Sequence, residues 1–328
     1  MGNEILSHRE ETVGPPLMFR PIRSTTTLAP RPAPRSPWSP TLSRNDPVKT
    51  AEALQRGKHT LRIPSLPGVV VELNELVRDP NVGVMDVGEL LAQDPDLSTR
   101  VLRIANSALF GLPTPVLDPR HAASILGLER LRTIVIQAGT TGLYGKQALR
   151  QDEHLSAHWR HSILTAHICR ELAKHATNPD LMEPEELHTA GLLHDMGRAI
   201  FLDNLRDKYL EVQEAASVEG MPLVEAERLT FGVNHAQVGA KVVLAWDLPR
   251  SMAQVIAFHH EPWRVAKALP STVLLAVADR LARAVEHNDL AGMPMVAERR
   301  DLHFLGLGRG AILAVARDAI QAWKSIEL

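Results

Sequence analysis

The sequence predicts an all-α protein, on three observations. Apolar residues recur three and four positions apart through most of the chain, which is the spacing of one helix face. Only 4% of the residues are aromatic, so Leu, Val, Ile and Ala must build the core, and Leu and Ala favour helices. No segment shows the sustained alternation of apolar and polar residues that a half-buried strand needs. The 45% hydrophobic and 23% charged content is that of a globular protein.

The first 57 residues differ from the rest because they are rich in proline, arginine and serine. Proline lacks a backbone donor and interrupts helical periodicity, so this segment is expected to be a disordered tail. Its stretch RPAPRSPWSP could dock on an aromatic groove as a polyproline helix. A passive tether is the preferred interpretation.

A smaller helical bundle is expected over residues 62–150, beginning with a helix over 69–77. Asp86 and Glu89 stand three apart in front of apolar residues, which is the arrangement of a capping box. The following helix comes after Asp96.

Glycine and proline mark the next helix boundaries. Gly111 is expected to end the helix that follows Asp96, because glycine is favoured just beyond a helix end. Asp118 and Pro119 give an N-cap and a first helical residue. The chain after them is expected to form two successive helices, over 121–127 and 128–139.

The second half of the chain is expected to form a larger set of helices. Pro184 stands at the start of one of them, where proline is favoured. The segment 298–304 contains acids and bases together and is interpreted as a solvated connector. The expected helices cover 158–176, 184–202, 222–231, 234–246, 249–260, 271–287 and 309–326.

Composition also limits the function. A net charge of −2 argues against a broad nucleic-acid-binding face. The single cysteine, Cys169, excludes an internal disulfide and fits a reducing compartment. No apolar run approaches the length of a membrane span, and the first residues lack the apolar core of a secretory signal. A cytoplasmic location is therefore expected.

A set of histidines and aspartates suggests a metal site. Each member lies on or at the end of a helix with an apolar face, so the polar groups can point inwards together. Imidazole and carboxylate both coordinate divalent ions such as Zn, Mn, Fe or Ni, and two ions could share one carboxylate. A lone histidine is more often an ordinary core residue, and a histidine pair can cap a helix. The set is His161, His194, Asp195, His235, His259, His260 and Asp279.

The residues around this set resemble a known family. GLLHDMG (191–197), with WRHSILTA upstream and HHEPW (259–263) downstream, resembles the HD superfamily of metal-dependent phosphohydrolases. More closely, the chain resembles the HDOD domain, the HD-related output domain of bacterial signalling proteins. The motifs that carry this resemblance are IPSLPGVVVEL, LLAQDPDLSTRVLRIANSALFG, AASILGLERLRTIVI, GLLHDMG and FGVNHAQVGAKVVLAWDLP.

The resemblance covers residues 62–260 and implies an HD-type helical domain in two parts, 62–150 and 151–260. The last segment, 261–328, is then expected to add helices that pack on the second part. The resemblance further implies that the seven histidines and aspartates bind one or two divalent ions, with Asp195 as the bridging carboxylate. Glu227 matches an acidic residue of the family that could orient His235 or face solvent.

The chain also departs from the catalytic relatives. It lacks the glycine-tyrosine-proline element that follows the double histidine in the phosphodiesterases that cleave cyclic di-GMP. Arg198 stands where those enzymes tend to have lysine; it could hold phosphate but does not replace lysine as a proton donor. Ala157 stands where an acidic ligand of a third metal would lie. Asp195 and Arg198 would be catalytic residues only if the protein is an enzyme.

The expected function is that of a cytoplasmic signal-transduction output or scaffold protein. Its partners would be signalling proteins, for example of a two-component or cyclic di-GMP pathway, or a nucleotide messenger. A two-metal phosphohydrolase or phosphodiesterase acting on a nucleotide is the alternative. A third possibility is a metal that only clamps helices together.

Overall fold

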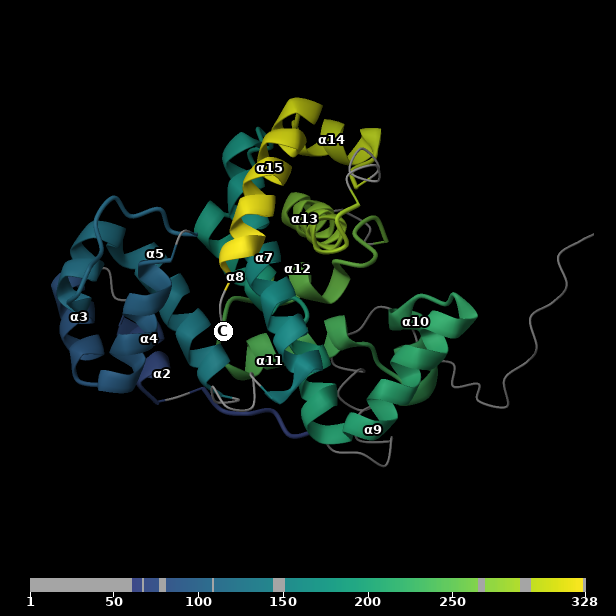
Figure 1. Ribbon diagram of the computed structural model, residues 1–328, viewed down its shortest axis with the longest axis horizontal. Coiled ribbons are helices and arrows are strands. Elements are labelled where there is room, and N and C mark those ends of the chain that lie inside the picture. Colours follow the sequence, from purple (N-terminus) through teal and green to yellow (C-terminus); the bar gives the residue numbers. More distant parts are fainter. Residues whose placement is uncertain are drawn as a thin grey trace, which may run out of the picture. The chain divides into compact units, whose positions relative to one another are not determined.

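The computed structural model describes residues 61–66, 68–76, 81–107, 109–143, 151–264, 269–289 and 296–326. These residues form helices and connecting loops without any strand, as the sequence predicts (Figure 1). No helix within them has the length and apolar character that a membrane crossing requires. The expected disordered tail over residues 1–57 lies outside the described residues.

The N-terminal helices are drawn in blue in Figure 1 and pack against one another around a shared core. They are α2 (Gly68–Leu76), α3 (Val84–Ala92), α4 (Pro95–Ala105) and α5 (Pro119–Gly142). Leu73, Leu91 and Leu97 are almost completely buried between them. Gly127 has φ of +75° inside α5 and divides it into two helical segments, at the boundary that the sequence predicts. Glycine adopts this conformation without a steric penalty.

Two of the expected helix boundaries are wrong in detail. The cap of α3 is formed by Gly83, whose backbone N–H donates to Asp86 Oδ2 at 2.8 Å, and Glu89 takes no part in it. Helix α4 ends at Ala105 instead of Gly111. The Asn106 side chain bonds both the N–H and the carbonyl of Val116, and this pairing holds the chain in a turn before Gly111 is reached.

The remaining helices lie around α7 and α13, in which most residues are buried. Helix α7 packs against α8, α13 and α15, and α11 packs against α9 and α12. One hydrophobic core extends from Leu66 in the N-terminal segment to Ile326 after α15. The helices are α7 (Glu153–His175), α8 (Pro184–Leu193), α9 (Met196–Glu219), α10 (Leu223–Phe231), α11 (His235–Ala245), α12 (Arg250–Phe258), α13 (Pro270–Glu286), α14 (Arg299–Leu305) and α15 (Arg309–Ser325).

Two expectations for this half are corrected. The helix expected over 184–202 is two helices, because the chain breaks at His194 and Asp195 and then continues as α9 to Glu219. The segment expected to be a solvated connector forms the short helix α14. Asp301 in α14 is buried and accepts hydrogen bonds from Trp263 and Arg280, which explains why a charged segment packs as a helix here.

Glycines allow two close helix contacts beside the break. A Cβ on Gly191 would lie 2.8 Å from Ala166 Cα, so α8 packs directly on the backbone of α7. A Cβ on Gly197 would lie 2.0 Å from the carbonyl oxygen of His235, so α9 starts against the start of α11. These contacts bring the segment between Gly191 and Gly197 next to α7, which carries His161, and next to α11, which begins at His235.

Candidate metal centre

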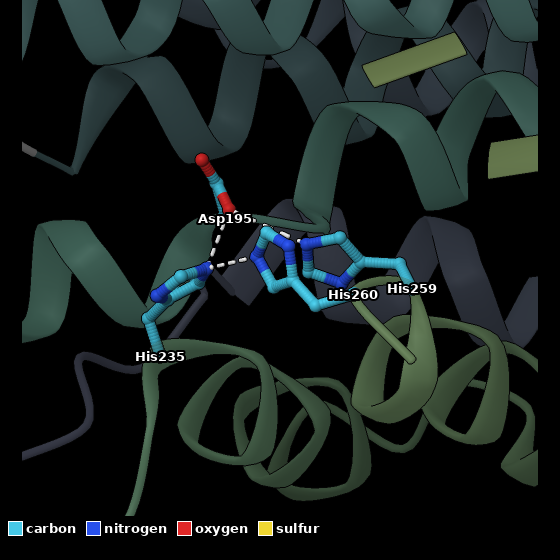
Figure 2. Close-up of side chains that lie close together, drawn as sticks. All are labelled: Asp195, His235, His259 and His260. Carbon is cyan, nitrogen blue, oxygen red and sulfur yellow. Dashed lines mark hydrogen bonds and ion pairs between the residues drawn. The ribbon is translucent and has the colours of Figure 1, made fainter. Parts of the chain in front are cut away.

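The seven predicted residues come together in the buried space between α7, α8, α9, α11, α12 and α13. They form two groups, and within each group the candidate ligand atoms all lie within 4.8 Å of one another. Figure 2 shows the larger group, with the three imidazoles turned towards the carboxylate. The larger group is Asp195, His235, His259 and His260; the smaller group is His161, His194 and Asp279.

Helix ends supply most of these side chains. His194 and Asp195 lie at the break between α8 and α9, and Asp195 has the non-helical angles φ −99° and ψ 9°. Successive residues within a helix point about 100° apart, so a continuous helix would turn these two side chains away from each other. His235 begins α11 and His259 follows the end of α12.

Asp195 is the residue that joins the two groups. Its Oδ1 lies 3.0 Å from His235 Nε2 and 3.6 Å from His259 Nε2. The same oxygen is 3.6 Å from His194 Nε2, which belongs to the smaller group. Its Oδ2 lies on the other side and accepts a hydrogen bond of 3.1 Å from Arg198 Nη1. The carboxylate therefore presents one oxygen to three imidazoles and the other to the guanidinium of Arg198 and, at 4.0 Å, to the imidazole of His161.

Three converging atoms of the centre are buried without a hydrogen-bond partner: His194 Nε2, His259 Nε2 and Asp195 Oδ1. The other ring nitrogen of each histidine is held by a backbone carbonyl, of Gly191 at 2.7 Å and of Ile256 at 2.7 Å. A carbonyl only accepts, so each Nδ1 carries the proton and each Nε2 directs a lone pair into the centre. Buried polar atoms are normally satisfied, so these atoms fit a bound cation better than an ordinary core.

The smaller group is held by ion pairs. His161 Nε2 lies 3.0 Å from Asp279 Oδ1, and His194 Nε2 lies 3.7 Å from the same oxygen. Although burial lowers the pKa of His161, its hydrogen bonds to Asp279 and Glu286 raise that pKa to about 9. Burial works against ionisation of Asp279, but the charge of Arg283 holds the pKa of its carboxyl well below the usual value.

Six of the seven residues of this centre, all except Asp279, lie in a part of the chain that matches a known protein family. The HDOD domain family matches the chain over residues 63–262, which is more than half of its length. The chain belongs to the HDOD family. The resemblance inferred from the motifs is thereby confirmed.

Relatives of this HDOD protein come from several bacteria. An uncharacterized protein of Treponema pallidum is 27% identical over 198 residues, which make up 60% of this chain and 37% of that protein. The chain therefore spans little more than a third of the length of this curated relative.

Solved structures share the fold. A candidate phosphohydrolase of Shewanella amazonensis superposes with a TM-score of 0.67 at 26% identity, over 84% of this chain and 98% of that one. An HDOD domain protein of unknown function from Geobacter sulfurreducens superposes with a TM-score of 0.68 at 23% identity, over 85% and 95% of the two chains.

Glu227 lies behind His235 and does not face solvent, which settles the question that the sequence left open. Its Oε2 accepts hydrogen bonds from the backbone N–H of His235 at 2.8 Å and from the ring Nδ1 at 2.7 Å. Tyr209 donates to the other carboxylate oxygen at 2.8 Å. Burial lowers the pKa of His235, but the charges of Glu227 and Asp195 raise it to about 9.

Two further residues at the candidate metal centre lie on α13 and were missed in the sequence. Glu286 accepts from His161 Nδ1 at 2.8 Å and so turns the Nε2 of that ring inwards. Arg283 donates to Asp279 Oδ1 at 3.0 Å. Both stand on the helix face of Asp279, four and seven residues further on, and this spacing is the signal that could have found them.

His260 and His158 complete the surroundings. His260 Nε2 lies 2.7 Å from His235 Nε2, and burial, together with His259 and His235, lowers the pKa of His260. His158, one turn before His161 on α7, is buried with no hydrogen bond at either ring nitrogen. Burial lowers its pKa to about 3, so the ring is neutral. Ala157, at the position of the missing acidic residue, is exposed.

Proposed function

We propose that this HDOD protein binds one or two divalent transition-metal ions at the seven-residue centre and acts as a signal-transduction output protein in the cytoplasm. The observation that carries the metal proposal is the convergence of three buried atoms, His194 Nε2, His259 Nε2 and Asp195 Oδ1, of which the two nitrogens have no hydrogen-bond partner. An ion would give the two nitrogens the partner that the protein itself does not supply, and Asp195 Oδ1, which lies 3.0 Å from His235 Nε2, could bind the same ion.

The donor set fits such an ion. Imidazole nitrogen and carboxylate oxygen are the ligands that Fe, Mn, Zn and Ni accept, and buried carboxylates hold the ligand rings from behind. Glu227 would hold His235, and Glu286 would hold His161. Asp195 lies within reach of both groups and would bridge two ions.

An output role is preferred over catalysis because the chain lacks elements on the substrate side. The glycine-tyrosine-proline element is absent from the sequence that follows His260, and Arg198 takes the place of a lysine. An arginine stays protonated and cannot deliver a proton to a leaving group. The partner would be a signalling protein of a two-component or cyclic di-GMP pathway, or a nucleotide messenger.

A metal-dependent phosphohydrolase is the second candidate. It is supported by the likeness to the Shewanella amazonensis candidate phosphohydrolase at 26% identity and by the contact between Arg198 and Asp195. A bound divalent ion would supply Lewis-acid polarisation of a phosphoryl oxygen. Arg198 would orient the Asp195 carboxylate and offer its guanidinium to the phosphate.

Metal analysis of protein purified without chelator tests the proposal, with Asp203→Asn as the control for Asp195→Asn. Asp203 is an exposed carboxylate of α9 outside the centre. We expect about one or two equivalents of transition metal in the wild type and in the control, and loss of metal in Asp195→Asn. Less than about half an equivalent in the wild type would overturn the metal proposal.

Assays on metal-loaded protein then separate the roles. Turnover of a generic phosphodiester or a cyclic dinucleotide, abolished in Asp195→Asn, would establish the enzyme in place of the output protein. A purely structural clamp requires a large fall in melting temperature on chelation and no turnover. The output role predicts that the wild-type protein shows no turnover and captures a signalling partner, which is then identified.

A further inference from the structure

Two arginines approach the same side of the centre, and we propose that Arg198 and Arg283 form a cradle for the phosphoryl group of a dianionic phosphate or phosphate monoester. This inference rests on the proposed metal function and names the class of ligand that the centre takes. It assigns to Arg283 a role in ligand binding in addition to its ion pair with Asp279.

The two guanidiniums meet at one oxygen atom. Arg198 Nη1 lies 3.1 Å from Asp195 Oδ2, and Arg283 Nη2 lies 4.0 Å from the same atom. The imidazoles of His194, His235 and His259 approach the other oxygen, Oδ1. Three candidate ligands therefore approach one oxygen of the carboxylate, and the two arginines approach the other, together with His161 Nε2 at 4.0 Å. A phosphoryl group on the Oδ2 side could contact both arginines and a metal ion bound to Asp195.

The arginines remain accessible although the ligands are buried. The side chain of Arg283 is 42% exposed and that of Arg198 is 22% exposed, whereas that of Asp195 is fully buried. Arg283 neutralises the buried carboxylate of Asp279, and the exposed part of its side chain stays open to a ligand. Arginine presents several N–H groups in a planar fork that matches two oxygens of a phosphate.

The charges of the centre match a dianion. Two guanidiniums, of Arg198 and Arg283, stand with four carboxylates, those of Asp195, Asp279, Glu227 and Glu286. Two divalent ions with neutral imidazoles would bring the positive charges to six against four negative ones. The excess of two equals the charge that a phosphate monoester carries at neutral pH.

A hollow beside the centre leaves room for the rest of a phosphorylated ligand. It has a volume of about 510 Å³, and its lining includes His260, Trp263 and Arg280. His260 belongs to both the hollow and the candidate metal group. Arg280 stands one helical turn before Arg283 on α13 and is held by Asp301, so α13 carries both a wall of the hollow and one of the two arginines.

Calorimetric titration of manganese-loaded protein with inorganic phosphate tests the cradle. Arg283→Gln removes the guanidinium and keeps a polar side chain. The matched control is Arg206→Gln, because Arg206 is 45% exposed and pairs with Asp152 away from the centre. We expect phosphate to bind about tenfold more weakly to Arg283→Gln, within twofold of wild type to Arg206→Gln, and at an intermediate level to Arg283→Lys.

The outcomes separate the cradle from the metal proposal, since manganese content is measured for each protein after gel filtration. Unchanged phosphate affinity in Arg283→Gln with full metal content overturns the cradle and leaves the metal centre standing. If the wild type retains no manganese, the metal proposal fails. Titration of the metal-free protein with phosphate then tests the cradle by itself. Phosphate binding that depends on Arg283 then upholds the cradle, and no binding overturns it.

Discussion

The buried carboxylate of Glu227 accepts hydrogen bonds from both the ring and the backbone of His235. The contact fixes the ring so that Nδ1 faces Glu227 and Nε2 lies 3.0 Å from Asp195 Oδ1. A carboxylate that holds the far side of a ligating imidazole sets the orientation of the ring and makes its other nitrogen a stronger electron-pair donor to a metal. Because Tyr209 also donates to Glu227, the orientation is held from α9 as well as α10.

Glu227→Gln should therefore weaken metal binding while leaving the ligands themselves in place. The amide keeps one oxygen acceptor for His235 but loses the negative charge, so we expect metal affinity to fall by roughly 10- to 100-fold. Glu225→Gln, on the exposed face of the same helix, should leave affinity unchanged. Competition with a metal-binding dye measures both. Equal affinities of the two variants would show that Glu227 does not act through His235.

Asp195→Asn should destabilise the metal-free protein as well as remove the bridging ligand. Burial opposes ionisation of Asp195, but the imidazoles of His194 and His235 hold the pKa of its carboxyl well below the usual value. The neutral amide would leave Arg198 without its counter-charge, and breaking a buried pair in this way costs about 3–5 kcal/mol. Urea unfolding in EDTA measures this, with Asp203→Asn expected within about 0.5 kcal/mol of wild type. An equally small change in the unfolding free energy of Asp195→Asn would contradict the expected destabilisation.

The seven residues that the structure brings together could be singled out in the sequence because most of them lie in short local motifs with a fixed order. The sequence also predicted the start of α5 at Asp118 and Pro119 and its division at Gly127, since capping and glycine conformations are local properties. It missed the break at His194 and Asp195, where helix-forming residues continue on both sides. The break is imposed by packing of α9 against α11, which local propensity does not encode.

The partners of the ligands were harder to predict, for the same reason. Glu286 and Arg283 are ordinary charged residues on a helix, and their role follows only from the position of His161 on α7 relative to α13. His158 could be expected to be a core residue, but its lack of any hydrogen bond depends on the packing around it. A sequence pattern records which residues share a helix face, and tertiary contacts decide which of them meet.

Metal-free and metal-loaded protein should respond to pH in opposite directions. In the metal-free protein the pKa of His161 and that of His235 are raised from 6.5 to about 9. Their contribution to stability is fully present below pH 6.5, where folded and unfolded chains are both protonated, and is lost as pH rises to about 9. Metal binding needs neutral imidazoles, so metal affinity rises over the same interval.

Urea unfolding between pH 6.5 and 9 checks this, once in EDTA and once in a saturating divalent ion. We expect the free energy of unfolding to fall with pH in EDTA and to rise with pH in the presence of the metal. Parallel curves would show that the two histidines do not bind the ion. His161→Gln should flatten the curve in EDTA, because one of the two raised groups is then absent.

Gly197→Ala should disturb the centre without changing any ligand. A Cβ at this position would lie 2.0 Å from the carbonyl oxygen of His235 and 2.7 Å from its carbonyl carbon. Backbone atoms cannot rotate away as a side chain can, so α9 and α11 must move apart, at a cost of roughly 1–3 kcal/mol. The movement would carry His235 away from Asp195, and metal content should fall below that of the wild type.

Gly310→Ala provides the control for this substitution. A Cβ on Gly310 meets no atom within 4 Å, and the residue lies in the first turn of α15, so alanine should be neutral or stabilise by up to about 1 kcal/mol. Thermal unfolding and metal analysis of both variants give the comparison. Gly197→Ala protein with wild-type stability and full metal content would mean that the close approach of α9 to α11 does not position His235.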